Sequence, residues 1–193
     1  MPITPDATGY VAPGSNSVAI HGSFFMYSDC NDGIKPCSTI TTPTSTTSFP
    51  NVGGLMCTSG TTVTETGTAA NAWGAGMGLE LNDGPPQQPY DATTYNIKGF
   101  CFVLSGPTLP STGLRVAFTT KENQDYAPFE TVTTAGVTTV LFSNIAQGSW
   151  VSKADTFTFD PTEVMLMQWQ VPGNTTAPIP WDFCVQGVTA ITE

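Results

Sequence analysis

The stretch Ala72-Trp73-Gly74-Ala75-Gly76-Met77-Gly78-Leu79-Glu80-Leu81-Asn82 decides the fold class of this chain. It begins with a tryptophan among glycines and continues as a run in which apolar residues alternate with polar or small ones. Successive side chains of a strand point to opposite faces, which separates Met77, Leu79 and Leu81 from Gly78, Glu80 and Asn82. We expect a strand that buries its apolar face in a sandwich and offers its other face to a polar ligand.

The same kind of pattern recurs along the chain and predicts about eight to ten short strands. The clearest expected strands lie at 17–27, 77–82, 99–106, 114–119, 138–142, 164–171 and 181–191, and residues 55–64 are expected to form a strand or a hairpin. Charged residues make up only 10% of the 193 residues, while Gly (19) and Pro (16) are frequent, a composition typical of strands and turns. We expect one all-β domain over residues 1–193, an antiparallel β-sandwich with long loops and at most short helical turns, one of them at 159–163.

Two segments are expected to lie outside the main strands because of their composition. Residues 1–16 form a polar lead-in rich in Pro and Gly, which pairs late as an edge strand. Residues 38–51 are rich in Thr, Ser and Pro, and we expect a long surface loop there.

The charge balance limits the partners. Five Lys and Arg against fifteen Asp and Glu give a formal net charge of −10. Nucleic acids and anionic membrane surfaces are bound through basic patches, which such a chain does not supply. No apolar run approaches the roughly 20 residues that span a bilayer, so we expect no membrane insertion. Neutral polymers such as polysaccharides remain open as partners.

The five cysteines stand at positions 30, 37, 57, 101 and 184, and none forms a C-x-x-C pair. With the low Lys content and the high Thr, Ser and Gly content, they indicate a secreted protein with disulfides. The short spacing of Cys30 and Cys37 predicts a local disulfide, and the odd count leaves one thiol over. The first five residues have neither the basic start nor the apolar core of a signal peptide, which predicts a leader removed from this chain.

Asp29 and Asp32 flank Cys30 in a turn cluster. Their carboxylates are candidate oxygen ligands for calcium, and the alternative is that they cap the turn.

Several phrases resemble one family when they are taken together in this order. They are Ala72-Trp73-Gly74-Ala75-Gly76-Met77-Gly78-Leu79, Tyr90-Asp91-Ala92-Thr93-Thr94-Tyr95, Gly99-Phe100-Cys101-Phe102, Phe159-Asp160-Pro161, Met167-Gln168-Trp169-Gln170 and Trp181-Asp182-Phe183-Cys184-Val185. The chain resembles the β-jelly-roll carbohydrate-binding modules of the galactose-binding-like type, which accompany secreted bacterial glycoside hydrolases. The likeness covers residues 70–190 well and the first 70 residues loosely.

This resemblance implies two antiparallel sheets, with a neutral glycan lying across the concave sheet or in loops at its rim. It implies a structural calcium near the chain ends, although Gln186-Gly187 stand where such modules often carry paired acidic residues. In the resembling fold the strands of Cys101 and Cys184 are neighbours, so the resemblance favours a disulfide between them and leaves Cys57 as the free thiol.

Sugar binding needs flat aromatic rings for the C–H face of a pyranose and planar polar groups for its hydroxyls. The candidate rings are Trp73, Tyr90, Tyr95, Tyr126, Trp150 and Trp181. Tyr126 and Trp150 lie in polar loops and are the rings we expect to be exposed. Trp73 is expected to anchor the entry of its strand, and Trp169 falls on a methionine-rich strand face that we assign to the core.

The polar candidates share the property of standing opposite the apolar face of their strands: Glu80, Arg115, Gln168 and Gln170. If their strands lie in one sheet, these side chains meet on one surface. A mid-strand Arg115 needs a partner, for which we expect Glu80. The alternative interpretation is a structural cross-strand pair of Glu80 and Arg115 beside solvated glutamines.

The sequence therefore predicts non-catalytic binding of a neutral polysaccharide or oligosaccharide such as a β-glucan, without a catalytic residue. One alternative is a structural or adhesive extracellular domain in a protein assembly. A second copy of the chain and an attached enzyme domain are the candidate protein partners. Another alternative is a jelly-roll glycoside hydrolase or lyase with a carboxylate pair drawn from Glu80, Glu130, Asp160 and Asp182.

Overall fold

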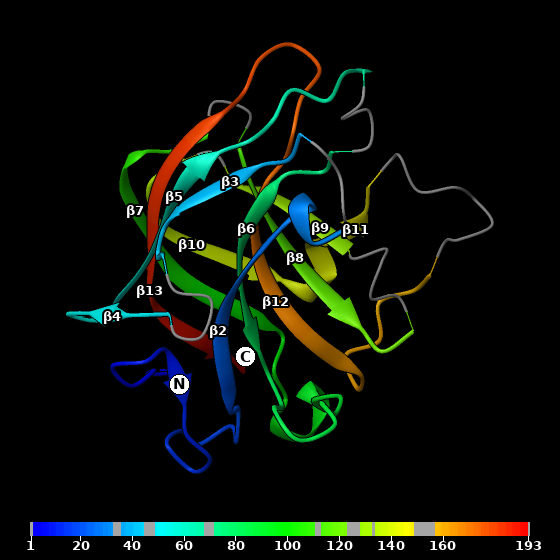
Figure 1. The fold of residues 1–193 in the computed structure, drawn as a ribbon. Helices are drawn as coiled ribbons and strands as arrows, with labels where there is room; N and C mark the ends of the chain where they lie inside the picture. Colours follow the sequence, from blue (N-terminus) through cyan, green and yellow to red (C-terminus); the bar gives the residue numbers. More distant parts are fainter. Residues whose placement is uncertain are drawn as a thin grey trace.

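The chain folds as two antiparallel β-sheets packed face to face (Figure 1). The structure is a computed structural model that describes residues 2–32, 36–44, 49–67, 72–110, 113–122, 128–132, 134–148 and 157–192, without the side chains of 31–32 and 128–132. The regular secondary structure of the described residues consists of strands and of the short 3-10 turns η1 (Asp29–Asp32), η3 (Ala92–Tyr95) and η4 (Phe142–Asn144). The all-β sandwich expected from the sequence is confirmed.

The first sheet has seven strands in the order β1-β2-β6-β12-β8-β9-β11. Their bounds are β1 (Tyr10–Val11), β2 (Gly22–Ser28), β6 (Ala75–Glu80), β12 (Val164–Val171), β8 (Leu114–Thr120), β9 (Pro128–Val132) and β11 (Ala146–Gln147). All of the pairings are antiparallel. Strand β6, which the sequence predicted to carry a polar ligand-binding face, therefore lies in the interior of this sheet, between β2 and β12.

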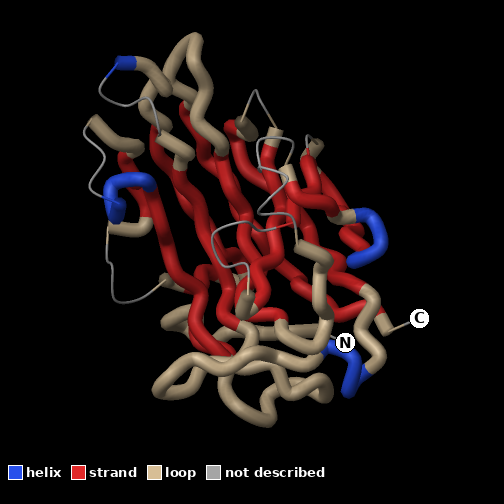
Figure 2. The backbone as a smooth tube through the Cα atoms, turned by 90° about the vertical axis from the view of Figure 1, so that its right-hand side faces the viewer, coloured by secondary structure: helices blue, strands red, loops and turns tan. Residues whose placement is uncertain are grey.

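The second sheet has six strands, five of them in the order β10-β7-β13-β5-β3, and β4 pairs with β5. Their bounds are β10 (Gly136–Leu141), β7 (Gly99–Thr108), β13 (Pro180–Ile191), β5 (Leu55–Thr61), β3 (Thr39–Thr42) and β4 (Asn51–Val52). Figure 2 shows the strands running between two ends at which the loops gather. Both termini lie at the same end, and β6 begins at the opposite one (Figure 1).

The core lies between the facing sides of the sheets, where the alternation predicted it. Met77 and Leu79 of β6 have no exposed surface, and neither does Trp169 of β12. The Trp169 ring meets Phe102 of the other sheet edge-on, with ring centroids 5.5 Å apart. Large aromatic side chains of this kind supply much of the apolar area that a sandwich buries. The assignment of Trp169 to the core is confirmed.

The structure corrects some of the expected boundaries. Residues 39–42 form an edge strand of the six-stranded sheet, inside the segment predicted to be a loop, because β-branched threonines suit an edge position as well as they suit a loop. The strand expected at 17–27 begins only at Gly22, since Ala19 has a φ of 54° and the Asn16 side chain hydrogen-bonds the backbone of Ile20 on both sides. The lead-in does supply an edge strand, β1.

The disulfides confirm one expected pair and overturn the other. Cys30 is bonded to Cys37, as the spacing predicted. Cys184 is bonded to Cys57, and Cys101 is the free thiol, so the pairing implied by the family resemblance is wrong. The reason is register: Cys57 stands directly opposite Cys184 across β5 and β13, whereas Cys184 faces Ser105 on β7 and Cys101 faces Thr189.

Candidate functional site

The outer face of the seven-stranded sheet carries most of the polar residues that the sequence predicted for binding. Its residues follow from the register of β2, β6, β12 and β8, since the neighbouring positions on each strand are buried in the core. We call the first line across these strands the tyrosine row: Tyr27, Gly76, Gln170 and Arg115. The next line is the phenylalanine row: Phe25, Gly78, Gln168 and Ala117. The third is the glutamate row: Glu80, Leu166 and Thr119.

One side of this face is aromatic. Phe25 and Tyr27 are neighbours on β2, with ring centroids 6.0 Å apart. Tyr27 in turn stacks on Trp73, which precedes β6, at 5.7 Å and an interplanar angle of 26°. All three are half-buried, so that they form a line of aromatic rings along the face. We call Phe25, Tyr27 and Trp73 the aromatic line.

Glycines separate the aromatic line from the polar side chains of β12. A Cβ at Gly78 would lie 2.4 Å from the Phe25 ring, which rests on the bare backbone there. A Cβ at Gly76 would lie 2.1 Å from the carbonyl oxygen of Trp169 on the next strand. Close contacts of this kind require glycine. Gly76 and Gly78 are both buried, and the Phe25 ring covers the backbone at Gly78, so the ring reaches over β6 toward the glutamines of β12.

Gln170 is held beside Trp73. It is 9% exposed, and its Nε2 donates a hydrogen bond to the carbonyl oxygen of Trp73 at 3.2 Å. Its Oε1 is buried and has no hydrogen-bond partner in the described part of the chain, and the same is true of the Tyr27 hydroxyl in the same row. Burial raises the pKa of Tyr27 above its ordinary value, so the phenol stays protonated. Buried polar atoms without a partner are uncommon in folded proteins.

Arg115 closes the other end of the tyrosine row. Burial lowers the pKa of its half-buried guanidinium, and the negative charge of Glu65 opposes that shift. Glu65 belongs to the loop that follows β5, where its N–H donates to the carbonyl oxygen of Asn174. The charge that stabilises Arg115 thus comes from a loop beside the sheet.

The register of β6, β12 and β8 keeps Arg115 and Glu80 apart, so the pair expected from the sequence is not formed. Glu80 is aligned with Leu166 and Thr119, four residues along β8 from Arg115. With two strand spacings between them as well, their Cα atoms lie about 16 Å apart. Glu80 accepts a hydrogen bond from the backbone N–H of Ser23, and burial, followed by the charge of Asp83, raises its pKa. Glu80 and Arg115 share the face but belong to its opposite ends.

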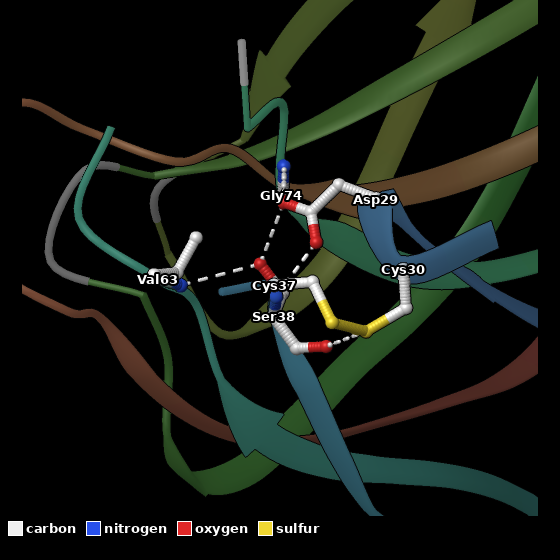
Figure 3. The surroundings of a disulfide bond; sticks show 6 residues. All are labelled: Asp29, Cys30, Cys37, Ser38, Val63 and Gly74. Atoms are coloured by element: carbon white, nitrogen blue, oxygen red, sulfur yellow. Dashed lines mark hydrogen bonds between the residues drawn. A yellow bond between two sulfur atoms is a disulfide. The ribbon is translucent and has the colours of Figure 1, made fainter. Parts of the chain in front are cut away.

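Asp29 does not fit a calcium ligand. Its buried carboxylate accepts hydrogen bonds from the N–H of Ser38 at 2.6 Å, the Ser38 hydroxyl at 2.9 Å and the N–H of Gly74 at 3.0 Å (Figure 3). The neighbouring sulfurs of Cys30 and Cys37 are joined in a disulfide and are closed to a metal as well. Three protein donors already satisfy the carboxylate, which makes its role structural. The side chain of Asp32 lies outside the described residues.

The remaining aromatic candidates fall into two groups. Trp181 and Tyr90 are buried, at 2% and 5% exposure, and the Tyr90 hydroxyl donates to the Val18 carbonyl at 2.6 Å. Tyr95 is half-buried and stacks on Tyr90 with centroids 6.3 Å apart. Tyr126 and Trp150 lie outside the described residues. A pocket of about 420 Å³ between η3 and η4 holds none of the predicted binding residues.

Sequence reasoning missed Phe25 and Tyr27. The signal was present, because Phe25 and Tyr27 alternate with Phe24 and Met26 along one expected strand. What the sequence does not show is that β2 lies next to β6, which brings Tyr27 against Trp73. Trp73 is itself better placed than expected, since its ring belongs to the outer face as well as to the entry of β6.

No family model matches the sequence, and no curated protein matches it. Among solved structures, the chain is similar to a family 11 carbohydrate-binding module from Clostridium thermocellum in complex with a β-1,3-1,4-mixed-linked tetrasaccharide. The TM-score is 0.52 at 12% identity, over 95% of this chain and 94% of that one. The likeness is one of fold.

Two further structures are similar over much of this chain. A solution structure of CtCBM11 matches with a TM-score of 0.39 at 11% identity, over 87% of each chain. An exo-β-agarase matches with a TM-score of 0.37 at 8% identity, over 81% of this chain and 25% of that one.

Proposed function

We propose that this chain binds a neutral polysaccharide, without catalysis, on the outer face of its seven-stranded sheet. The observation that carries the proposal is the aromatic line of Phe25, Tyr27 and Trp73, which shares one sheet face with Gln168 and Gln170. The C–H face of a pyranose packs on such rings, and planar amides grip its hydroxyl pairs.

The charges of the chain favour a neutral ligand. The net charge is −10, and the acidic Glu80 and Asp83 stand at one end of the face. Arg115, the cation within the tyrosine row, has the charge of Glu65 nearby. An anionic polymer would meet repulsion from the net charge of the chain and from the Glu80 and Asp83 end of the face. A β-glucan is the substrate class to test first, since the solved module of similar fold holds a mixed-linked tetrasaccharide.

Among the carboxylates that the sequence offered for hydrolysis, Glu80 stands on the outer face, and the side chain of Glu130 lies outside the described residues. Asp182 belongs to β13 of the other sheet, and Asp160 accepts two hydrogen bonds from Thr162 in a turn. The acid whose charge acts on Glu80 is Asp83, in the loop beyond β6. We therefore propose that no residue of the outer face acts as a catalyst.

Two disulfides indicate an oxidising compartment. No helix in the described ranges is long and apolar enough to cross a membrane. We propose that the chain is secreted and serves to hold an attached enzyme domain, or a cell surface, to its glycan.

Binding to a panel of neutral polysaccharides by affinity electrophoresis, followed by calorimetry with the best oligosaccharide, tests the proposal. Trp73→Ala should abolish retardation, because it removes one of the three stacking rings. Gln168→Ala should weaken affinity about tenfold, which corresponds to one or two hydrogen bonds.

The matched control is Gln186→Ala, since Gln186 is also a half-buried mid-strand glutamine but belongs to β13 of the other sheet. It should leave binding unchanged. Equal losses for Gln168→Ala and Gln186→Ala, or no retardation by any neutral polymer, would overturn the proposal.

A further inference from the structure

We infer that Asp29, locked by the Cys30–Cys37 disulfide, is a positioning residue that sets the orientation of Trp73 in the aromatic line. The inference rests on the proposed function for its consequence in binding. The orientation of Trp73 itself can be measured without any ligand.

The first step is the pair of hydrogen bonds between Asp29 and Gly74. The N–H of Asp29 donates to the carbonyl oxygen of Gly74 at 2.9 Å, while the Asp29 carboxylate accepts from the N–H of Gly74 at 3.0 Å. Gly74 has a φ of 106°, and a Cβ there would lie 2.0 Å from the carbonyl oxygen of Val171. Both polar groups of this glycine are therefore bound by one residue, in a conformation that favours glycine.

The second step is that Trp73 and Tyr27 lie next to these hydrogen bonds in the sequence. Trp73 immediately precedes Gly74, and Tyr27 lies two residues before Asp29. The same two chain segments are therefore joined twice, by the hydrogen bonds between Asp29 and Gly74 and by the stack of Tyr27 on Trp73, whose ring centroids are 5.7 Å apart. From the opposite side, the carbonyl oxygen of Trp73 accepts a hydrogen bond from Gln170. Both the carbonyl oxygen and the N–H of the peptide bond that follows Trp73 are therefore held by hydrogen bonds.

The third step explains why the carboxylate stays in place. Asp29 has no exposed surface, and its two oxygens also accept from the N–H and the hydroxyl of Ser38. Ser38 follows Cys37 directly, and its hydroxyl accepts a hydrogen bond from the N–H of Val63 in turn. Figure 3 shows the disulfide joining the two sides of this cluster, from Cys30 beside Asp29 to Cys37 beside Ser38. The disulfide thus holds the two donors of Ser38 against the carboxylate.

The chemistry of the cluster makes it sensitive to small changes. A buried carboxylate with three donors is held by charge-assisted hydrogen bonds, which are about twice as strong as neutral ones. An asparagine of the same shape would turn an N–H₂ group toward one of these donors and leave it without an acceptor. The cluster would then open, and Trp73 would lose one of its two supports.

The test compares Asp29→Asn and the double variant Cys30→Ser/Cys37→Ser with Cys57→Ser/Cys184→Ser. The last is a matched control, because its disulfide lies between β5 and β13 in the other sheet. The readout without ligand is the near-ultraviolet circular dichroism contributed by Trp73, taken as the difference between the wild type and Trp73→Phe. The second readout is affinity for the best neutral oligosaccharide.

We expect Asp29→Asn and Cys30→Ser/Cys37→Ser to lose most of the Trp73 signal and to weaken affinity about tenfold, the effect of one charge-assisted hydrogen bond. The control should keep both. If a variant does not fold, Ser38→Ala replaces it, since it removes one donor, and a smaller loss of the same signal is expected.

A full Trp73 signal in folded Asp29→Asn, or equal losses in both disulfide variants, would overturn the inference. If the protein binds no neutral glycan, the proposed function fails, whereas the Trp73 signal still decides whether Asp29 positions the ring.

Discussion

Glu80 shows how the surroundings of a single residue change its chemistry. The sequence predicted that Glu80 pairs with Arg115. In the structure, the Glu80 carboxylate stands at the opposite end of the face from Arg115, near the charge of Asp83. Burial and the like charge of Asp83 raise its pKa, so the carboxyl holds its proton to a higher pH in the folded protein than in the unfolded chain. A carboxyl whose pKa is raised by folding contributes stability below its unfolded pKa and loses it as the pH rises through the folded one.

Glu80→Gln should therefore raise the melting temperature at pH 7 and leave it nearly unchanged at pH 3, below the unfolded pKa of about 4.3. The glutamine keeps an oxygen for the N–H of Ser23 but carries no charge. Thermal melts across this pH range check the prediction. A lower melting temperature for the variant at pH 7 would contradict it.

Two tyrosines give a second prediction at this scale. The Tyr27 hydroxyl is buried without a hydrogen-bond partner in the described residues, whereas the Tyr90 hydroxyl donates to the Val18 carbonyl. Tyr27→Phe should leave the free energy of unfolding unchanged or raise it by up to about 1 kcal/mol, and Tyr90→Phe should lower it by about 1 kcal/mol. Urea denaturation measures both. A loss in Tyr27→Phe would mean that a bound water satisfies its hydroxyl.

At the scale of the strand, β6 combines a fully buried inner face with an outer face that carries two glycines. The sequence predicted the burial of Met77 and Leu79 because alternation is a local property of the chain. The sequence also contains the two glycines, but it does not show which neighbouring atoms approach them. Gly76 allows the backbone of β12 to approach, and Gly78 allows the Phe25 ring to rest on the sheet.

Gly76→Ala should lower the free energy of unfolding by about 3 kcal/mol, since its Cβ would meet the backbone oxygen of Trp169 at 2.1 Å. Gly84→Ala is the control, because the nearest atom to its Cβ is an oxygen of Pro86 at 3.7 Å. It should be neutral or slightly stabilising. Denaturant titration compares the two, and equal effects would show that the contact at Gly76 relaxes at little cost.

At the scale of the whole molecule, the two disulfides do different work. Cys57–Cys184 joins residues 127 positions apart, while Cys30–Cys37 joins residues 7 apart. Chain entropy assigns about 5 kcal/mol to a loop of the first length and about 2 kcal/mol to the second. The long-range disulfide therefore stabilises the sandwich, and the short one shapes the cluster around Asp29.

Cys57→Ser/Cys184→Ser should accordingly lower the free energy of unfolding more than Cys30→Ser/Cys37→Ser does, although it should affect the Trp73 signal less. Guanidinium denaturation with near- and far-ultraviolet dichroism measures stability and local order in the same samples. A larger loss of stability from the short disulfide would contradict the prediction.

The sequence by itself determined most of the long strands, their buried faces and the outward direction of Arg115, Gln168 and Gln170, because alternation and composition act within each strand. Tertiary structure alone decided which strands are neighbours and in what register. That is why Cys57 pairs with Cys184, why Glu80 lies far from Arg115, and why Tyr27 stacks on Trp73. Contacts between strands depend on packing summed over the whole sandwich, and no single stretch of sequence carries that sum.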